Sequence, residues 1–511
     1  MPTPVTGRGG SGRGATTPGP WRCAWALLSL RWRMVRKRRH RIGLAVAGLL
    51  APSLLGLALP LSQHLPPGAD PETALALAGA IFFAVAAIAP LAAGGGYQLF
   101  PPDQVAGLAV TAPTMVRSSV LLTPLNLAWY AQTVGLVTLT FALHTAAGAT
   151  LALLALIAAW VSAATIVGQA IAWTIAGVRR SSRGRLASWV LLALVIGLVF
   201  FGRSQLLNSV LAGPGRLIAL TRNGQLQPAL TAAALLTVLA WLGIKVADRA
   251  CAWTIHRRTL GTQAGPTDQQ FGRRSAPATP YRALLRSDRA SVWRSAPLRR
   301  GLLVLGLLPA VAAGLARLDW PSLALLPAFV GSGAALLFGV NAFCLVGGGA
   351  VWLSTIPQNH RLTLYSKAQV MFETTGLAVA VGMSGGLLRA RFSPDRISVA
   401  ATLASVLVAT TLVMASCLRL SVVHPHRADL LGSRDTPAPP GAMALYAARL
   451  TALAGIPAAA FSIFARLQVG WPVLVSAVLL LTWAGMSIRG TIRRWDDPMV
   501  RANVAATVAS G

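Results

Sequence analysis

The stretch that decides the fold covers residues 148–176 and reads GATLALLALIAAWVSAATIVGQAIAWTIA, with no Asp, Glu, Lys or Arg in it. A helix rises about 1.5 Å per residue, so about 20 apolar residues cross the roughly 30 Å hydrocarbon core of a bilayer. Because the stretch is longer than that, it predicts a transmembrane helix that tilts or extends into the cytoplasm.

Further apolar runs lie on both sides of this stretch. We expect spans near residues 42–61, 73–96, 121–143, 186–202, 228–246, 301–316, 321–343, 370–388, 397–418, 447–464 and 472–488. The length of the first run and the basic cluster before it indicate a retained helix rather than a signal peptide. The predicted fold is an all-α polytopic integral membrane protein, with about twelve transmembrane helices in two similar six-helix halves.

The composition agrees with a membrane protein and argues against a soluble enzyme. Of the 511 residues, 55% are hydrophobic and only 11% are charged, whereas about 25% is typical of soluble domains. The four scattered cysteines form no C-x-x-C pair, so they predict neither a disulfide framework nor a zinc site. We expect no metal site, and we expect His424 and His426 to lie in a solvated loop.

The positive charge predicts the orientation in the membrane. The chain carries 45 Lys and Arg against 13 Asp and Glu. With the N-terminus inside, most of these basic residues fall on cytoplasmic segments, as the positive-inside rule requires. Because the basic residues are spaced between apolar runs, we expect the lipid bilayer rather than nucleic acid as their partner. We expect a multi-pass protein of the plasma membrane with both termini in the cytoplasm.

The same pattern divides the chain into segments. Residues 1–30 predict a disordered cytoplasmic tail, because Gly, Pro, Ser and Thr dominate the first twenty. The further segments are a first six-helix half (31–246), a basic cytoplasmic linker with some helix near Tyr281 to Arg294 (247–300), a second half (301–490) and a cytoplasmic C-terminal tail (491–511).

A short motif, Thr-x-Pro-x-x-x-Arg, occurs once in each predicted half, after its second span. It comprises Thr111, Pro113 and Arg117 in the first half and Thr355, Pro357 and Arg361 in the second. Since proline breaks a helix, each motif predicts a turn followed by a short helix along the cytoplasmic surface. We expect Arg117 and Arg361 to project toward water or a partner. The alternatives are simple inter-span loops and docking elements for a cytoplasmic protein.

Catalytic motifs are absent from the sequence. None of the three lysines completes the Gly-x-x-x-x-Gly-Lys-Ser/Thr loop that binds nucleotide phosphates. We therefore predict that the chain is not an enzyme and holds no cofactor itself.

Two stretches carry a family resemblance. The segment NAFCLVGGGAVWLSTIP (341–357), followed by Lys367, resembles the segment after the second span in permeases of type-2 ABC exporters. LFPPDQ (99–104), Pro113 and LNLAW (125–129) resemble its counterpart in large actinobacterial permeases of this kind. Cys344 and Val346 depart from the pattern, because the family has Gly and an acidic residue there.

The resemblance implies six spans per half and two copies of a separate cytoplasmic ABC ATPase, which would bind the ATP-Mg. A duplicated chain would supply both halves of an exporter. The coupling candidates are Thr111, Pro113, Arg117, Thr355, Pro357, Arg361 and Lys367.

Glu373 supports a different class of function. It lies in or near the ninth predicted span, and an ionisable residue in a bilayer is a functional candidate by default. It could serve an ion-coupled secondary transporter, or it could be an interfacial residue paired with Lys367 or a neighbouring Arg. A membrane scaffold or immunity protein that transports nothing is the third alternative.

Overall fold

The computed structural model describes residues 19–34, 71–93, 110–123, 127–179, 181–201, 204–256, 277, 279–316, 318–390, 394–426, 438 and 440–509. Its regular elements are all helices over these residues. The first predicted span, 42–61, and the LFPPDQ stretch lie outside the described residues.

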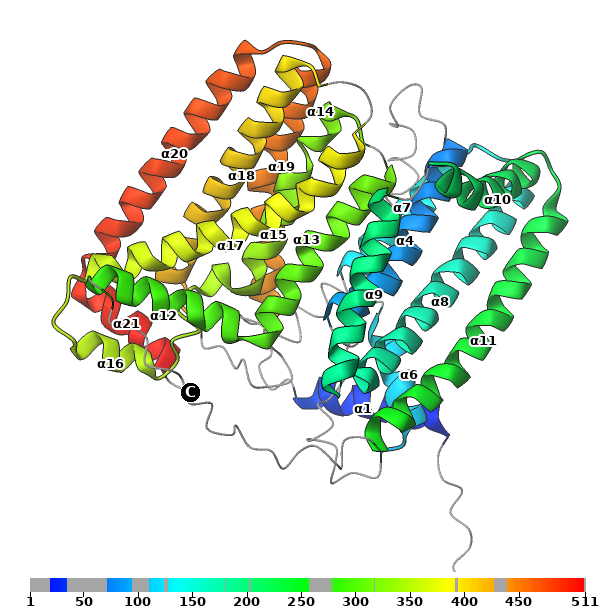
Figure 1. The fold of residues 1–511 in the computed structure, drawn as a ribbon, viewed down its shortest axis with the longest axis horizontal. Coiled ribbons are helices and arrows are strands. Elements are labelled where there is room, and N and C mark those ends of the chain that lie inside the picture. The colour runs from blue at the N-terminus through cyan, green and yellow to red at the C-terminus, as the bar shows by residue number, and fades with distance from the viewer. Residues whose placement is uncertain are drawn as a thin grey trace, which may run out of the picture.

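The helices pack as two neighbouring groups (Figure 1). The first group contains α1 (Pro20–Met34), α4 (Pro71–Ala93), α6 (Ala112–Leu122), α7 (Leu127–Ala142), α8 (Ala147–Val178), α9 (Ser182–Phe201), α10 (Ser204–Arg222) and α11 (Leu226–His256). The second contains α12 (Pro280–Arg294), α13 (Ala296–Ala316), α14 (Trp320–Leu323), α15 (Leu326–Phe338), the 3₁₀ turn η2 (Gly339–Asn341), α16 (Gly349–Thr355), α17 (His360–Arg389), α18 (Arg396–Val423), α19 (Pro440–Arg466), α20 (Trp471–Trp495) and α21 (Pro498–Ala509).

Nine helices among the described residues are long and apolar enough to cross a membrane. They are Pro71–Pro90, Ala147–Val178, Leu226–Ile255, Leu298–Ala316, Trp320–Asn341, His360–Leu388, Arg396–Val423, Leu445–Arg466 and Trp471–Trp495. Each overlaps one of the predicted spans, so the prediction of an all-helical, multi-pass membrane protein is confirmed at this level.

The predicted span 121–143 is wrong as a single helix. The structure has the short helix α6, which ends at Leu122, and the separate helix α7, which begins at Leu127. The sequence carries Pro124 between them. Proline has no amide hydrogen and its ring collides with the preceding turn, so it favours a helix end here.

Helices also extend into segments that were predicted as linker and tail. α11 continues through Ala247 to His256, and α20 and α21 occupy most of 491–511. The predicted helix near Tyr281 to Arg294 is confirmed by α12. Thr279 caps its N-terminus by accepting a hydrogen bond from the backbone N–H of Arg282 at 3.3 Å, and Pro280 fits the first turn because no amide is needed there.

Small residues let the helices of the first group approach closely. A Cβ added at Gly168 of α8 would lie 2.6 Å from the carbonyl oxygen of Ala86 in α4. Nearer the N-terminal ends of both helices, the indole N–H of Trp160 in α8 donates to the carbonyl of Gly79 in α4 at 3.0 Å. Small residues at such contacts are typical of helix packing in membranes.

The two groups meet along α13, which packs against α4 and α9. Ile88, Ile175, Leu192 and Val311 are all buried in this junction. The outward surfaces are apolar, as lipid contact requires: Leu235 of α11 and Leu474 of α20 are 71% and 68% exposed.

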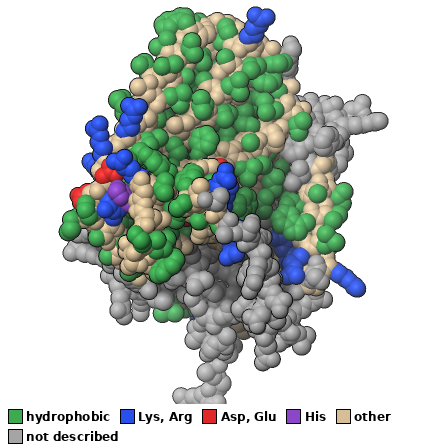
Figure 2. Space-filling model, turned by 60° about the vertical axis from the view of Figure 1, so that its left-hand side comes forward, with side chains coloured by type: hydrophobic (Ala, Val, Ile, Leu, Met, Phe, Trp, Pro, Cys, Tyr) green, Lys and Arg blue, Asp and Glu red, His purple; other side chains and the backbone are tan. Residues whose placement is uncertain are grey.

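The charged side chains divide the molecule into two ends. We call the end where α1, α6, α12, α16 and α21 lie the basic end (Figure 1). The Lys and Arg whose side chains the structure describes at the opposite end are Arg216, Arg222, Arg396 and Arg466. Apart from the top rim, the blue side chains in Figure 2 lie along the left edge and the lower part of the coloured surface, around an area where hydrophobic side chains predominate.

Candidate functional site

The candidate site is the corner between α15 and α17 at the basic end, which contains α16. Two contacts with the C-terminal end of α18 fix the start of this corner. The side-chain amide of Asn341 donates to the carbonyl of His426 at 2.5 Å, and the hydroxyl of Ser421 accepts from the N–H of Ala342 at 2.9 Å. Gly347 has a φ of +52°, a left-handed conformation that glycine adopts without steric cost, and it turns the chain into α16.

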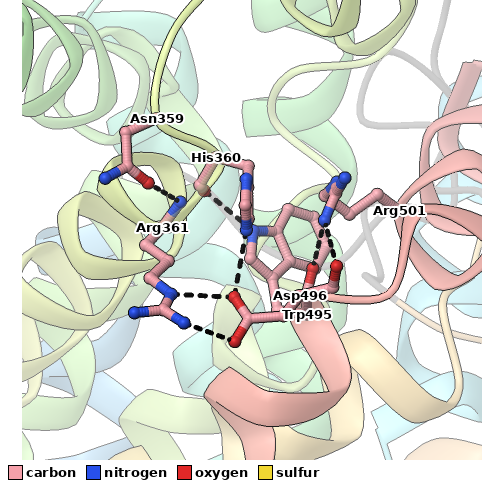
Figure 3. Close-up of polar contacts among 6 residues, drawn as sticks. All are labelled: Asn359, His360, Arg361, Trp495, Asp496 and Arg501. Carbon is pink, nitrogen blue, oxygen red and sulfur yellow. Dashed lines mark hydrogen bonds and ion pairs between the residues drawn. The ribbon is translucent and has the colours of Figure 1, made fainter.

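The first turn of α17 is tied to the end of α20 (Figure 3). The guanidinium of Arg361 donates two hydrogen bonds to the carboxylate of Asp496, both at 2.8 Å, and His360 Nε2 lies 3.0 Å from the same carboxylate. Asn359 caps α17 by accepting from the N–H of Arg361 at 3.0 Å. The hydrogen bonds from Arg361, and next those from His360, lower the pKa of Asp496 to about 2.

Aromatic and backbone contacts support this ion pair. The indole of Trp495 donates to the carbonyl of His360 at 2.8 Å and stacks on Phe343, with ring centroids 4.9 Å apart. Arg501 of α21 donates to the carbonyls of Trp495 and Asp496 at 2.8 Å each. Residues Asn359, His360, Arg361 and Asp496 line an open hollow of about 430 Å³.

The other two residues of the second motif flank the link between α16 and α17. Thr355 is the last residue of α16, and its hydroxyl donates to the carbonyl of Trp352 at 2.8 Å. Pro357 lies in the link and is exposed. The short helix precedes Pro357, and the helix that follows is the long α17, so the predicted short helix after this motif is wrong. Val351 and Trp352 of α16 are 50% and 66% exposed.

Two side chains of α17, Lys367 and Glu373, form ion pairs with α12, the helix that runs across the basic end. The Lys367 ammonium donates to the Asp288 carboxylate at 2.5 Å, and both groups are buried; Ser366 also donates to Asp288. The next residue of α12, Arg289, forms two hydrogen bonds to Glu373, at 2.8 and 2.5 Å. Glu373 is thus paired with an arginine of another helix, not with Lys367.

The first motif is placed differently. Thr111 is the residue before α6, and Pro113 lies in its first turn, so the predicted turn and short helix are found here. Arg117, however, is only 8% exposed and is paired with Asp248 of α11, with Trp21 of α1 stacked on its guanidinium at 6.0 Å. The expectation that Arg117 projects toward water is wrong, because α1 and α11 cover it.

Both motifs lie at the basic end, but they do not share one local structure. Arg117 sits in the second turn of a short buried helix, whereas Arg361 sits in the first turn of a long helix. No motif in the sequence points to the acids that pair with the basic coupling candidates, namely Asp248, Asp288 and Asp496. The sequence does carry a signal for Asp248, because an acid on an apolar helix such as α11 needs a basic partner.

Comparisons with known proteins give no match to a family model, a curated protein or a solved structure. The described residues also contain no group of three or more His, Cys, Asp or Glu that could hold a metal ion.

Proposed function

We propose that the chain is the membrane-spanning permease subunit of an ABC exporter. Its twelve spans would form two six-span halves, namely the nine long helices together with 42–61, α7 in place of 121–143, and 186–202. Two copies of a separate cytoplasmic ATPase would bind ATP-Mg and supply the energy. The chain itself would carry out no catalysis.

The observation that carries this proposal is the exposed apolar surface of α16. Val351 and Trp352 stand out from the basic end on a helix that is only seven residues long. An exposed tryptophan beside polar residues is a typical anchor for a protein partner. We infer that the ATPase docks on α16, with Thr355, Pro357 and Arg361 at the base of the contact.

The connection from α16 to α17 can transmit movement into the membrane. Only residues 356–359 separate the two helices, and α17 continues for 30 residues across the molecule. The Arg361–Asp496 pair and the Trp495–Phe343 stack bind the start of α17 to α20 and to the turn before α16. A displacement of α16 by an ATPase would therefore shift α17 and α20 together.

The charge distribution favours a cytoplasmic position for this surface. Most described Lys and Arg lie at the basic end, and cytoplasmic segments of membrane proteins carry the excess of basic residues. We propose the plasma membrane as the location, with both termini in the cytoplasm.

Glu373 is the acid on which an ion-coupled mechanism would depend. Its carboxylate is held by Arg289 and also accepts a hydrogen bond from Gln369 at 2.8 Å. A carboxylate engaged in this way is poorly suited to binding a transported cation. These contacts favour the ABC permease over the ion-coupled transporter.

The test is co-purification of the tagged full chain in mild detergent, with mass spectrometry of what remains bound. We expect a stoichiometric soluble protein that carries a phosphate-binding loop. Trp352→Ser should reduce its recovery at least tenfold. The matched control is Trp471→Ser, because Trp471 is 72% exposed at the opposite end and should not affect recovery. Absence of such a protein in several mild detergents, or full recovery with Trp352→Ser, would contradict the proposal.

A further inference from the structure

Helix α12 has two chemically distinct faces. Arg282, Arg286, Arg289 and Trp293 follow one another at spacings of three or four residues, so they share one side of the helix. All four are exposed, with Trp293 at 46%. The neighbouring side of the helix carries Leu285, Asp288 and Val292, which are buried.

This helix lies directly before the start of a membrane-spanning helix. Only Ser295 separates α12 from α13, and the membrane-spanning part of α13 begins at Leu298. Arg299 and Arg300, in the first turns of α13, are also exposed. In Figure 1 α12 runs across the basic end rather than parallel to the spans. A basic amphipathic helix in this position is typical of binding at a membrane surface.

A further basic group lies where the two helix groups meet. Arg179, at the end of α8, donates to the hydroxyl of Ser188 at 2.7 Å and lies over the ring of Trp189, 4.9 Å from its centroid. Burial, and next the charge of Arg300 from the other group, lower the pKa of Arg179. Two arginines that repel one another across a junction are stabilised by an anion bound beside them.

We propose that the exposed face of α12 and the start of α13 bind the headgroups of anionic phospholipids in the leaflet at the basic end. Arg282, Arg286 and Arg300 would contact the phosphates, and Trp293 would lie between the headgroups and the acyl chains, where tryptophan is enriched. The charge of this surface matches an anionic headgroup, and its place beside a membrane span matches lipid rather than a soluble acidic protein.

The lipid contact would also bear on α17. The buried side of α12 is tied to α17 through Asp288–Lys367, and Arg289 is tied to Glu373. Headgroups held by Arg282 and Arg286 would therefore fix α17 relative to the membrane surface. This gives a physical route by which the lipid composition of the membrane can affect the longest helix of the second group.

The test is native mass spectrometry of the full chain in detergent, with equal amounts of dioleoyl phosphatidylglycerol and dioleoyl phosphatidylcholine. We expect the wild-type chain to retain phosphatidylglycerol preferentially. Each arginine near an anionic surface contributes roughly a fivefold factor, so Arg282→Gln with Arg286→Gln should lower the preference at least tenfold. Arg282→Lys with Arg286→Lys keeps the charge and should retain most of it.

The control is Arg216→Gln with Arg396→Gln, which removes the same charge from exposed positions at the opposite end. It should leave the preference unchanged. Equal retention by wild type and the α12 glutamine variant, or an equal loss in the control, would overturn the proposal. Loss of a co-purifying protein from the α12 variant with unchanged lipid preference would assign the surface to a protein partner instead.

A rise in melting temperature with phosphatidylglycerol, absent from the α12 glutamine variant, gives a second readout of the same binding.

Discussion

The pair between Asp288 and Lys367 illustrates how single residues hold this molecule together. The Asp288 side chain is 12% exposed and that of Lys367 is 5% exposed. Two charges so far from water are stable only while each compensates the other. The pair joins a helix that crosses the basic end to one that spans the molecule, so its loss affects both.

Removal of one partner should therefore cost more than removal of both. Asp288→Ala leaves a buried ammonium without its carboxylate, and we expect a loss of about 3–5 kcal/mol of stability. Asp288→Leu combined with Lys367→Met should recover most of that loss. Thermal unfolding of the purified variants in detergent measures the difference. As a control, Arg466→Gln breaks a largely exposed pair with Asp319, which should cost less than about 1 kcal/mol. A double variant as unstable as the single one would argue against the pairing.

Asp496 predicts a dependence on pH. Its pKa in the folded protein is about 2, below the ordinary value of 3.8. A carboxyl whose pKa is lowered on folding contributes stability above its unfolded pKa, and that contribution is lost as the pH falls toward the folded pKa. Asp496→Asn should lower the melting temperature at pH 5, where the wild-type carboxylate is still ionised. The difference from wild type should shrink between about pH 4 and pH 2. A difference that stays constant down to pH 2 would exclude this pair as its source.

At the scale of helices, close packing between α4 and α8 depends on one missing side chain. The Cβ of Gly168→Ala would meet the carbonyl oxygen of Ala86 at 2.6 Å, a backbone atom that cannot rotate away. We expect a loss of about 1–3 kcal/mol, the usual cost of overpacking. Gly135→Ala in α7 is the matched control, because no atom lies within 4 Å of the added Cβ. It should be neutral or stabilising by up to about 1 kcal/mol, since alanine favours helices. Melting temperatures of the two variants provide the comparison, and equal values would contradict the packing.

At the scale of the whole molecule, the property to test is its orientation in the membrane. Asn223 follows α10 at one end, and Asn503 lies in α21 at the basic end; both are exposed. With the four native cysteines replaced by alanine, Asn223→Cys should react with a membrane-impermeant maleimide in intact cells. Asn503→Cys should react only after the membrane is opened, since basic ends face the cytoplasm. The reverse labelling pattern would invert the orientation and remove α16 from the reach of a cytoplasmic ATPase.

Much of the fold was predictable because hydropathy is a local property. The runs near 148–176, 397–418 and 472–488 each contain enough apolar residues to cross a bilayer, and each became a long helix. Tyr281 to Arg294 was also predictable, since the helix begins at a threonine cap and a proline. The run 121–143 misled because its hydropathy is continuous although the sequence carries Pro124, a residue type that breaks helices.

The candidate site was predictable only in part. Arg361 was singled out by a sequence motif, and it does lie at the exposed end of α17. Arg117 belongs to the same motif but is buried, because its partner Asp248 lies 131 residues further along the chain. No local pattern could indicate that contact.

The sequence by itself determined the class of protein, the approximate positions of the nine long apolar helices among the described residues, and the uneven distribution of charge between its ends. Each of these follows from apolar and charged residues within a window of about twenty, which is the length that crosses a bilayer. The tertiary structure alone decided which acid meets which base, which motif arginine is buried, and that α12 is fixed to α17 through Asp288 and Glu373. Those outcomes depend on contacts between helices far apart in the chain, where geometry rather than composition selects the partner.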